Sequence, residues 1–118
     1  MSSFPHHKLD AFVPALALAK AVHEFCHKIP RGHRNLAEQL TRSSTAVVLN
    51  LSEGANRYGC KEKAHRYSIA RGECGETAAG IELAMVLGLV DEQAANQALE
   101  LAATTGRMLT GLIKSQQK

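Results

Sequence analysis

The stretch LTRSSTAVVLNLSEGANR, residues 40 to 57, decides the fold of this chain. Leu40, Val47 and Leu51 recur at the spacing that puts them on one face of a helix, which is the pattern of a helix facing a core. Gly54 lies on the same face, where a glycine costs up to about 1 kcal/mol relative to alanine. We therefore expect a second helix to pack closely against this one.

Polar residues share that helix face. Asn50, Glu53 and Arg57 fall at positions i, i+3 and i+7, and Glu53 is correctly placed four residues before Arg57 for an ion pair. One interpretation is a surface pair beside a solvated amide. The sharper one, which we adopt, is a partly buried structural cluster that also includes Glu76 and fixes the register of the helices.

The rest of the chain is also predicted to be helical. Its apolar residues are mostly Ala and Leu, and its three prolines lie outside the long periodic segments or at their starts. Connections are short, so we predict an all-α, antiparallel up-down-up-down four-helix bundle forming one domain over residues 1–118. The expected helices cover residues 10–28, 35–58, 61–87 and from 91 to between 114 and 118.

Terminal signals accompany these helices. Asn35, with Glu38 three residues later, is typical of a capping box at the start of the second helix. Gly59 and Gly88 are expected to end the second and third helices in the left-handed conformation. Asp91 and Glu92 are acids in the first turn of the last helix, where the helix dipole favours them.

Each predicted helix carries a core-facing stripe. In the second helix, Ser43 and Ser44 form a gap of small residues, and Gly and Ala crowd the third helix between residues 70 and 80. The stripes of the four helices are Leu18, Val22, Phe25 and Ile29; Leu36, Leu40, Val47 and Leu51; Tyr67, Ala70, Cys74, Ala78, Ile81 and Met85; and Ala94, Ala98, Leu101, Thr105, Met108 and Leu112.

Charge is distributed unevenly. Residues 31–71 hold eight Lys or Arg and three acids, whereas residues 72–100 hold six acids and no base. In an antiparallel bundle, one pole would gather Lys8, Arg57, Lys61, Lys63, Arg66, Arg71, Arg107, Lys114 and Lys118. The other pole would gather Glu82, Asp91, Glu92 and Glu100, beside the bases of the first loop. Solvated charge is one explanation; head-to-tail subunit contacts or an anionic partner such as nucleic acid are the others.

Metal chemistry is the main enzymatic alternative. Glu24 and His27, like Glu62 and His65, have the Glu-x-x-His spacing of di-iron bundle sites. The second helix, about 24 residues at 1.5 Å rise, would hold the two motifs roughly 30 Å apart, so one site cannot use both. We predict no metal and no cofactor, and the sequence has no nucleotide-binding or nucleophile-elbow motif.

Three cysteines, Cys26, Cys60 and Cys74, match no disulfide framework and predict a reduced cytoplasmic protein. Cys60 is the candidate for an exposed thiol, which we interpret as incidental. An apolar segment near residues 8–19 is interrupted by Asp10 and Pro14, unlike a signal peptide, and no apolar run reaches membrane-spanning length.

The central motif also resembles that of a known family, the four-helix-bundle proteins named from 23S rRNA intervening sequences. The residues that carry this resemblance are Leu40, Arg42, Ser43, Asn50 to Gly54, Arg57, Arg66, Tyr67, Ala70, Gly72 and Glu76. The resemblance implies a small non-enzymatic bundle that often assembles as a ring-like homopentamer. It extends distantly to the accessory variability determinant of diversity-generating retroelements, a basic protein associated with nucleic acid and a reverse transcriptase.

The functional hypothesis follows from the charge map and the resemblance together. We expect a cytoplasmic homo-oligomeric adaptor, with a protein partner encoded nearby and no membrane association. Sequence-tolerant RNA or DNA binding is assigned to the basic pole, through Arg57, Lys61, Lys63, Arg66, Arg107 and Lys114. The alternatives are a protein-interaction module that binds no nucleic acid and a metal-binding bundle enzyme.

Overall fold

A computed structural model describes residues 4–117 of the chain. The described chain is helical from end to end, with short connections. Its elements, in order, are the 3-10 turn η1 (Pro5–Lys8), α1 (Phe12–Cys26), the 3-10 turn η2 (Arg31–His33), α2 (Arg34–Ala55), α3 (Cys60–Val86) and α4 (Glu92–Ser115). The all-α class and the four predicted helices are confirmed.

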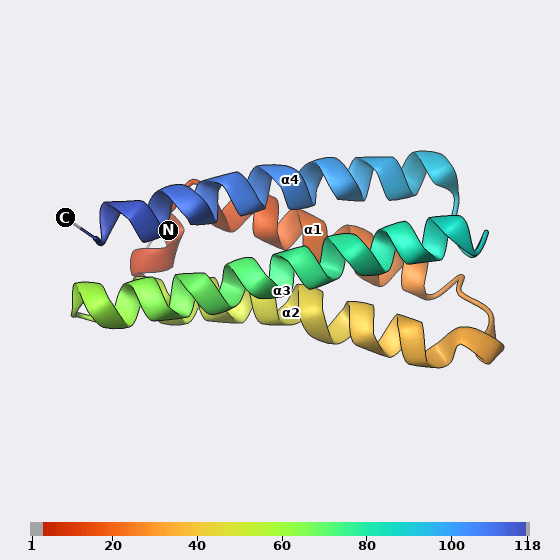
Figure 1. Ribbon diagram of the computed structural model, residues 1–118, viewed down its shortest axis with the longest axis horizontal. Coiled ribbons are helices and arrows are strands. Elements are labelled where there is room, and N and C mark those ends of the chain that lie inside the picture. Colours follow the sequence, from red (N-terminus) through yellow and green to blue (C-terminus); the bar gives the residue numbers. More distant parts are fainter. Residues whose placement is uncertain (1–3, 118) are drawn as a thin grey trace.

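Consecutive helices run in opposite directions along a body 44 Å long (Figure 1). α1 packs against α2 and α4, and α3 packs against the same two helices from the other side. The chain ends and the connection between α2 and α3 lie together at one end of the bundle, which we call the terminal end (Figure 1). The α1–α2 and α3–α4 connections lie at the other, the distal end.

The close approach of α2 and α3 explains why Gly54 lies on the core-facing side of α2. A Cβ built on Gly54 would lie 2.6 Å from Tyr67 Cε1, and one built on Gly80 would lie 2.6 Å from Leu40 Cδ2. Leu40 and Tyr67 are both buried. The two helices therefore meet at two points where one of them has no side chain, as predicted for Gly54.

The boundaries of α2 differ from prediction. The helix starts at Arg34, after a 3-10 turn, and its N-cap residue, His33, makes no side-chain capping bond, so the assignment of Asn35 as the cap is wrong. The helix ends at Ala55 instead of Tyr58, and Gly59 has φ −85° and caps the start of α3. Asn56 donates to the Ser52 carbonyl at 2.8 Å and closes the last turn without a left-handed residue.

Glycine and aspartate set the connection between α3 and α4. Gly88 has φ +69°, the left-handed conformation predicted for it, and the Leu89 amide donates to the Ala84 carbonyl at 2.9 Å. The Asp91 carboxylate then accepts the Ala94 amide at 3.0 Å and caps α4. This short connection turns the chain back along α3.

The core follows most of the predicted stripes in α1, α2 and α3, where Ile29, Leu36, Ala78 and Met85 are partly instead of fully buried, but α4 is rotated. Its buried residues are Ala95, Ala98, Ala102, Thr105 and Leu109. Ala94, Leu101, Met108 and Leu112 are only partly buried, so their assignment as the central stripe is wrong. Cys74 Sγ of α3 donates to the Ala102 carbonyl at 3.2 Å, which places the Ala102 side of α4 against α3.

Candidate nucleic-acid interface

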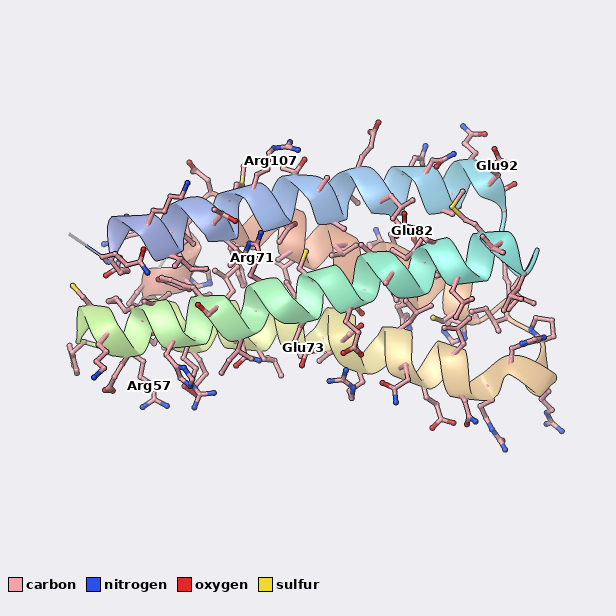
Figure 2. The ribbon with its side chains drawn as sticks, in the orientation of Figure 1. Arg57, Arg71, Glu73, Glu82, Glu92 and Arg107 are labelled. Carbon is pink, nitrogen blue, oxygen red and sulfur yellow. The ribbon has the colours of Figure 1, made fainter. Side chains whose placement is uncertain are left out.

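The terminal end gathers positive side chains from three helices. α2 ends and α3 begins there, so Arg57, Lys61, Lys63 and Arg66 lie near one another in space. α4 finishes at the same end and brings Lys114. Figure 2 shows Arg57, Arg71 and Arg107 in the terminal half and Glu82 and Glu92 in the distal half. Lys118, also predicted at this pole, lies outside the described residues.

Some of these cations are already held by neighbouring protein groups. Arg57 donates from Nε and Nη2 to Glu53 Oε2, at 3.1 and 2.7 Å, and this interaction lowers the pKa of Glu53. Lys63 Nζ donates to the carbonyls of Gly54 and Ala55, at 3.3 and 2.8 Å. These contacts order the two side chains and leave them fewer free hydrogen-bond donors for a ligand.

The other predicted contact residues differ in accessibility, and Lys61, Arg107 and Lys114 are exposed. Arg66 is part-buried and donates to Asn50 Oδ1 at 3.3 Å, while the side chain of Arg107 donates to Thr104 Oγ1 at 3.4 Å. Lys61 and Lys114 are exposed and make no ion pair within residues 4–117. Lys61, Arg107 and Lys114 are therefore the cations of this set that are best placed to meet a phosphate.

A crevice of about 380 Å³ lies among these residues, lined by Arg57, Lys61, Glu62, His65 and Arg66. Four of its five lining residues are Lys, Arg or His, and they come from the α2–α3 connection and the first two turns of α3. Its basic lining suits a phosphate or another small anion. The sequence analysis considered His65 only as a metal ligand. In the structure it lines this basic crevice.

Tyr58 is the residue of this surface that sequence reasoning missed. Its side chain is fully exposed in the connection between α2 and α3, beside a second hollow that Arg57 and Glu62 also line. Tyr58 was predicted as the last residue of the second helix and was given no binding role. Its position between the basic residues Arg57 and Lys61 was the available signal, because basic patches with an aromatic residue are typical of nucleic-acid surfaces.

The predicted polar cluster separates into two groups. Asn50 meets Arg66, and Glu53 pairs with Arg57 at the surface, where their side chains are 44% and 42% exposed. Glu76 is not part of that group, and placing it there was wrong: it pairs with Arg42, nearer the middle of α2.

Arg42 instead joins α2 to α3. It donates to Glu73 Oε2 at 3.1 Å as well as to Glu76, so one guanidinium holds two carboxylates of α3. Next to this network, the hydroxyl oxygens of Ser43 and Thr77 lie 2.8 Å apart and are buried. The sequence analysis treated Ser43 as a small residue and did not predict its hydrogen bond to Thr77, which joins α2 to α3.

The two Glu-x-x-His motifs lie where their spacing predicted. Glu24 and His27 are at the distal end of α1, and Glu62 and His65 are at the terminal end of α3. In the described part of the chain, no three His, Cys, Asp or Glu side chains are grouped so that they could hold a metal ion. None of the helices in residues 4–117 combines the length and apolar character needed to cross a bilayer.

Comparison with known proteins identifies relatives of this bundle. The family model described as 23S rRNA-intervening sequence protein matches residues 7–111. A crystal structure from Bacteroides thetaiotaomicron, of a protein of unknown function from the S23 ribosomal protein family, superposes with a TM-score of 0.79. The two chains are 17% identical, over 88% of this chain and 98% of that one, so the likeness concerns the fold. Among curated proteins, no significant match was found.

Proposed function

The chain belongs to the 23S rRNA-intervening sequence protein family, and we propose that it is a non-enzymatic, homo-oligomeric adaptor of the cytoplasm that binds RNA or DNA through its terminal end. The observations that carry the proposal are the basic crevice and the exposed Tyr58 at the α2–α3 connection, together with the accessible cations Lys61, Arg107 and Lys114. Three free cysteines, Cys26, Cys60 and Cys74, are consistent with a reducing compartment.

Binding of this kind would be tolerant of sequence. Lys and Arg side chains neutralise phosphates and release counterions, whatever the base. An exposed tyrosine offers a ring on which an unpaired base can stack, a contact that contributes about 1 to 3 kcal/mol per base. Single-stranded RNA or DNA is therefore the ligand that we expect to bind best.

Titration of fluorescently labelled single-stranded RNA and DNA at low and moderate salt tests this proposal. We expect the affinity to fall steeply with salt, and the double variant Lys61→Glu/Lys114→Glu to flatten the slope of log K against log[salt] by about 1.4, since each single-strand phosphate contact contributes about 0.7. These two lysines are preferred to Lys63 because reversal of Lys63 would also remove a contact that caps α2.

The matched control reverses the same amount of charge at the distal end, with Lys28→Glu/Arg31→Glu. Both residues are exposed and form no ion pair within residues 4–117. We expect this variant to bind nearly as the unmodified chain does. Equal losses in the two double variants would indicate a general charge effect, and no binding by the unmodified protein at low salt would reject the proposal.

The second candidate is a protein-interaction module without nucleic-acid binding. It is favoured by exposed apolar side chains at the distal end, where Leu83, Val86 and Leu87 follow one another along the last turn of α3. Such residues are typical of a protein contact surface. In that case the Lys61→Glu/Lys114→Glu variant would keep its assembly, and the unmodified protein would show no nucleic-acid binding to lose.

A further inference from the structure

Two histidines on the outer surface of α1 are placed unusually close together. His23 and His27 are one helical turn apart, and their Nε2 atoms are separated by 3.2 Å. The rings are nearly perpendicular, with centroids 4.6 Å apart, and both side chains are exposed. The two nitrogens therefore face each other at the surface, and the Glu-x-x-His comparison, which considered only His27, did not consider this pair.

The distance between the two nitrogens is that of a pair of metal ligands. Zinc binds imidazole nitrogen at about 2.0 to 2.1 Å, and a tetrahedral angle then separates two such nitrogens by about 3.3 Å. A hydrogen bond between the rings has a similar length, so the same arrangement can hold a proton or a cation. We propose that His23 and His27 form a bidentate site for a divalent transition-metal ion of the class that prefers imidazole, namely Cu²⁺, Ni²⁺ or Zn²⁺.

The surroundings leave room for such an ion. A groove of about 450 Å³ between α1 and α2 is lined by His23, His27, Cys26 and Glu38, together with Ala37, Thr41 and Arg42. Glu38 is exposed, and its Oε1 lies 3.7 Å from Arg34 Nε, so this carboxylate is paired with Arg34. Because the described residues hold no group of three potential ligands, water fills the remaining coordination positions.

Cys26 lines the same groove but is not one of the ligands. Its Sγ donates to the Ala37 carbonyl at 3.7 Å, toward α2. With two neutral imidazoles and water as ligands, the order of affinity should follow the usual series, with Cu²⁺ bound more tightly than Ni²⁺ or Zn²⁺.

Isothermal titration of the full chain with CuCl₂, NiCl₂ and ZnCl₂ tests the site. We expect one ion per chain to bind at His23 and His27, and His23→Ala to weaken this binding by about 100-fold, because the second ligand acts as an intramolecular contact of high effective concentration. Electron paramagnetic resonance of the Cu²⁺ complex should show two imidazole nitrogens in the unmodified chain and one in the variant.

The matched control exchanges two neighbours and keeps the composition. In the variant His27→Lys/Lys28→His the second histidine lies five residues from His23 and beyond the end of α1, so the i, i+4 spacing that brings the two rings together is lost. Circular dichroism should show an unchanged helix content, and the affinity should fall as it does in His23→Ala. Affinity equal to that of the unmodified chain would place the ion elsewhere, for example at His6 and His7, and would reject the proposal.

Discussion

At the scale of single residues, the absence of a side chain at Gly54 lets α2 pack closely against α3. An alanine Cβ there would lie 2.6 and 2.7 Å from two ring carbons of Tyr67 and 3.2 Å from Arg66 Cβ. Gly72, in the middle of α3, is exposed and would place a Cβ in open space. Both glycines are helical, Gly54 in the last turn of α2 and Gly72 in the middle of α3, and their surroundings differ.

We predict opposite outcomes for the same substitution at these two sites. Gly54→Ala should lower the free energy of unfolding by about 1 to 3 kcal/mol, because the added methyl group forces Tyr67 out of a buried position. Gly72→Ala should raise it by about 0.5 to 1 kcal/mol through helix propensity. Urea denaturation measures both, and a shift in the same direction for both variants would contradict the contact with Tyr67.

Glu53 and Arg57 show how exposure changes the meaning of a motif. Their spacing correctly indicated an ion pair, which the side chains form at 2.7 Å. Both side chains remain more than two-fifths exposed, and water and salt screen such pairs. The pair is therefore not a buried stabilising element. The buried feature of this motif is Gly54, one residue further on, which packs against Tyr67.

At the scale of elements, α3 caps α2. The C-terminal carbonyls of a helix lack partners inside that helix and carry its negative partial charge. Lys63, in the first turn of α3, donates to two of these carbonyls, those of Gly54 and Ala55. Lys63, which the sequence analysis assigned to nucleic-acid binding, thus also caps the end of α2.

Lys63→Met should therefore destabilise the bundle by about 1 kcal/mol, since it keeps most of the apolar stem and removes a charged donor. Lys61→Met is the control, because Lys61 is exposed two residues away and makes no ion pair among the described residues. Thermal denaturation should show a lower midpoint for the first variant only. Identical midpoints for the two variants would mean that the carbonyl contacts contribute no net stability.

At the scale of the whole molecule, charge and apolar exposure differ between the ends. The terminal end carries the basic crevice, and the distal end carries Glu82 and Glu92 near three exposed apolar residues of α3 (Figure 2). A surface whose ends are complementary favours head-to-tail contacts between copies, and such contacts close into rings when the rotation allows it. This is the basis of the oligomer in the proposed function.

Val86→Lys tests that oligomer. Val86 is 82% exposed, so its replacement should change the free energy of unfolding by no more than about 0.5 kcal/mol. It removes apolar contact area and adds a positive charge at the acidic end, so light scattering should show a shift toward monomer. Thr45→Lys, on the exposed side of α2, adds the same charge away from both ends and should leave the assembly intact.

The oligomer would be ruled out by light scattering that finds only monomers of the unmodified chain at micromolar concentration. A Val86→Lys protein that assembles as the unmodified chain does would place the contact surface away from the end of α3. Either result leaves the nucleic-acid titration interpretable, because that experiment depends on residues of the terminal end.

Local patterns were enough to predict the four helices, their order and the turn at Gly88, because periodicity, glycine and short connections act within a few residues of the chain. They were also enough to place Arg57, Lys61, Lys63, Arg66 and Lys114 at one end, since alternating helix direction fixes which termini meet. Only the tertiary structure decided which side of α4 is buried, that Glu76 pairs with Arg42, and that Lys63 caps α2. Such pairings depend on how each helix is rotated about its axis, where one residue amounts to about 100°, and that rotation is set by packing across the core.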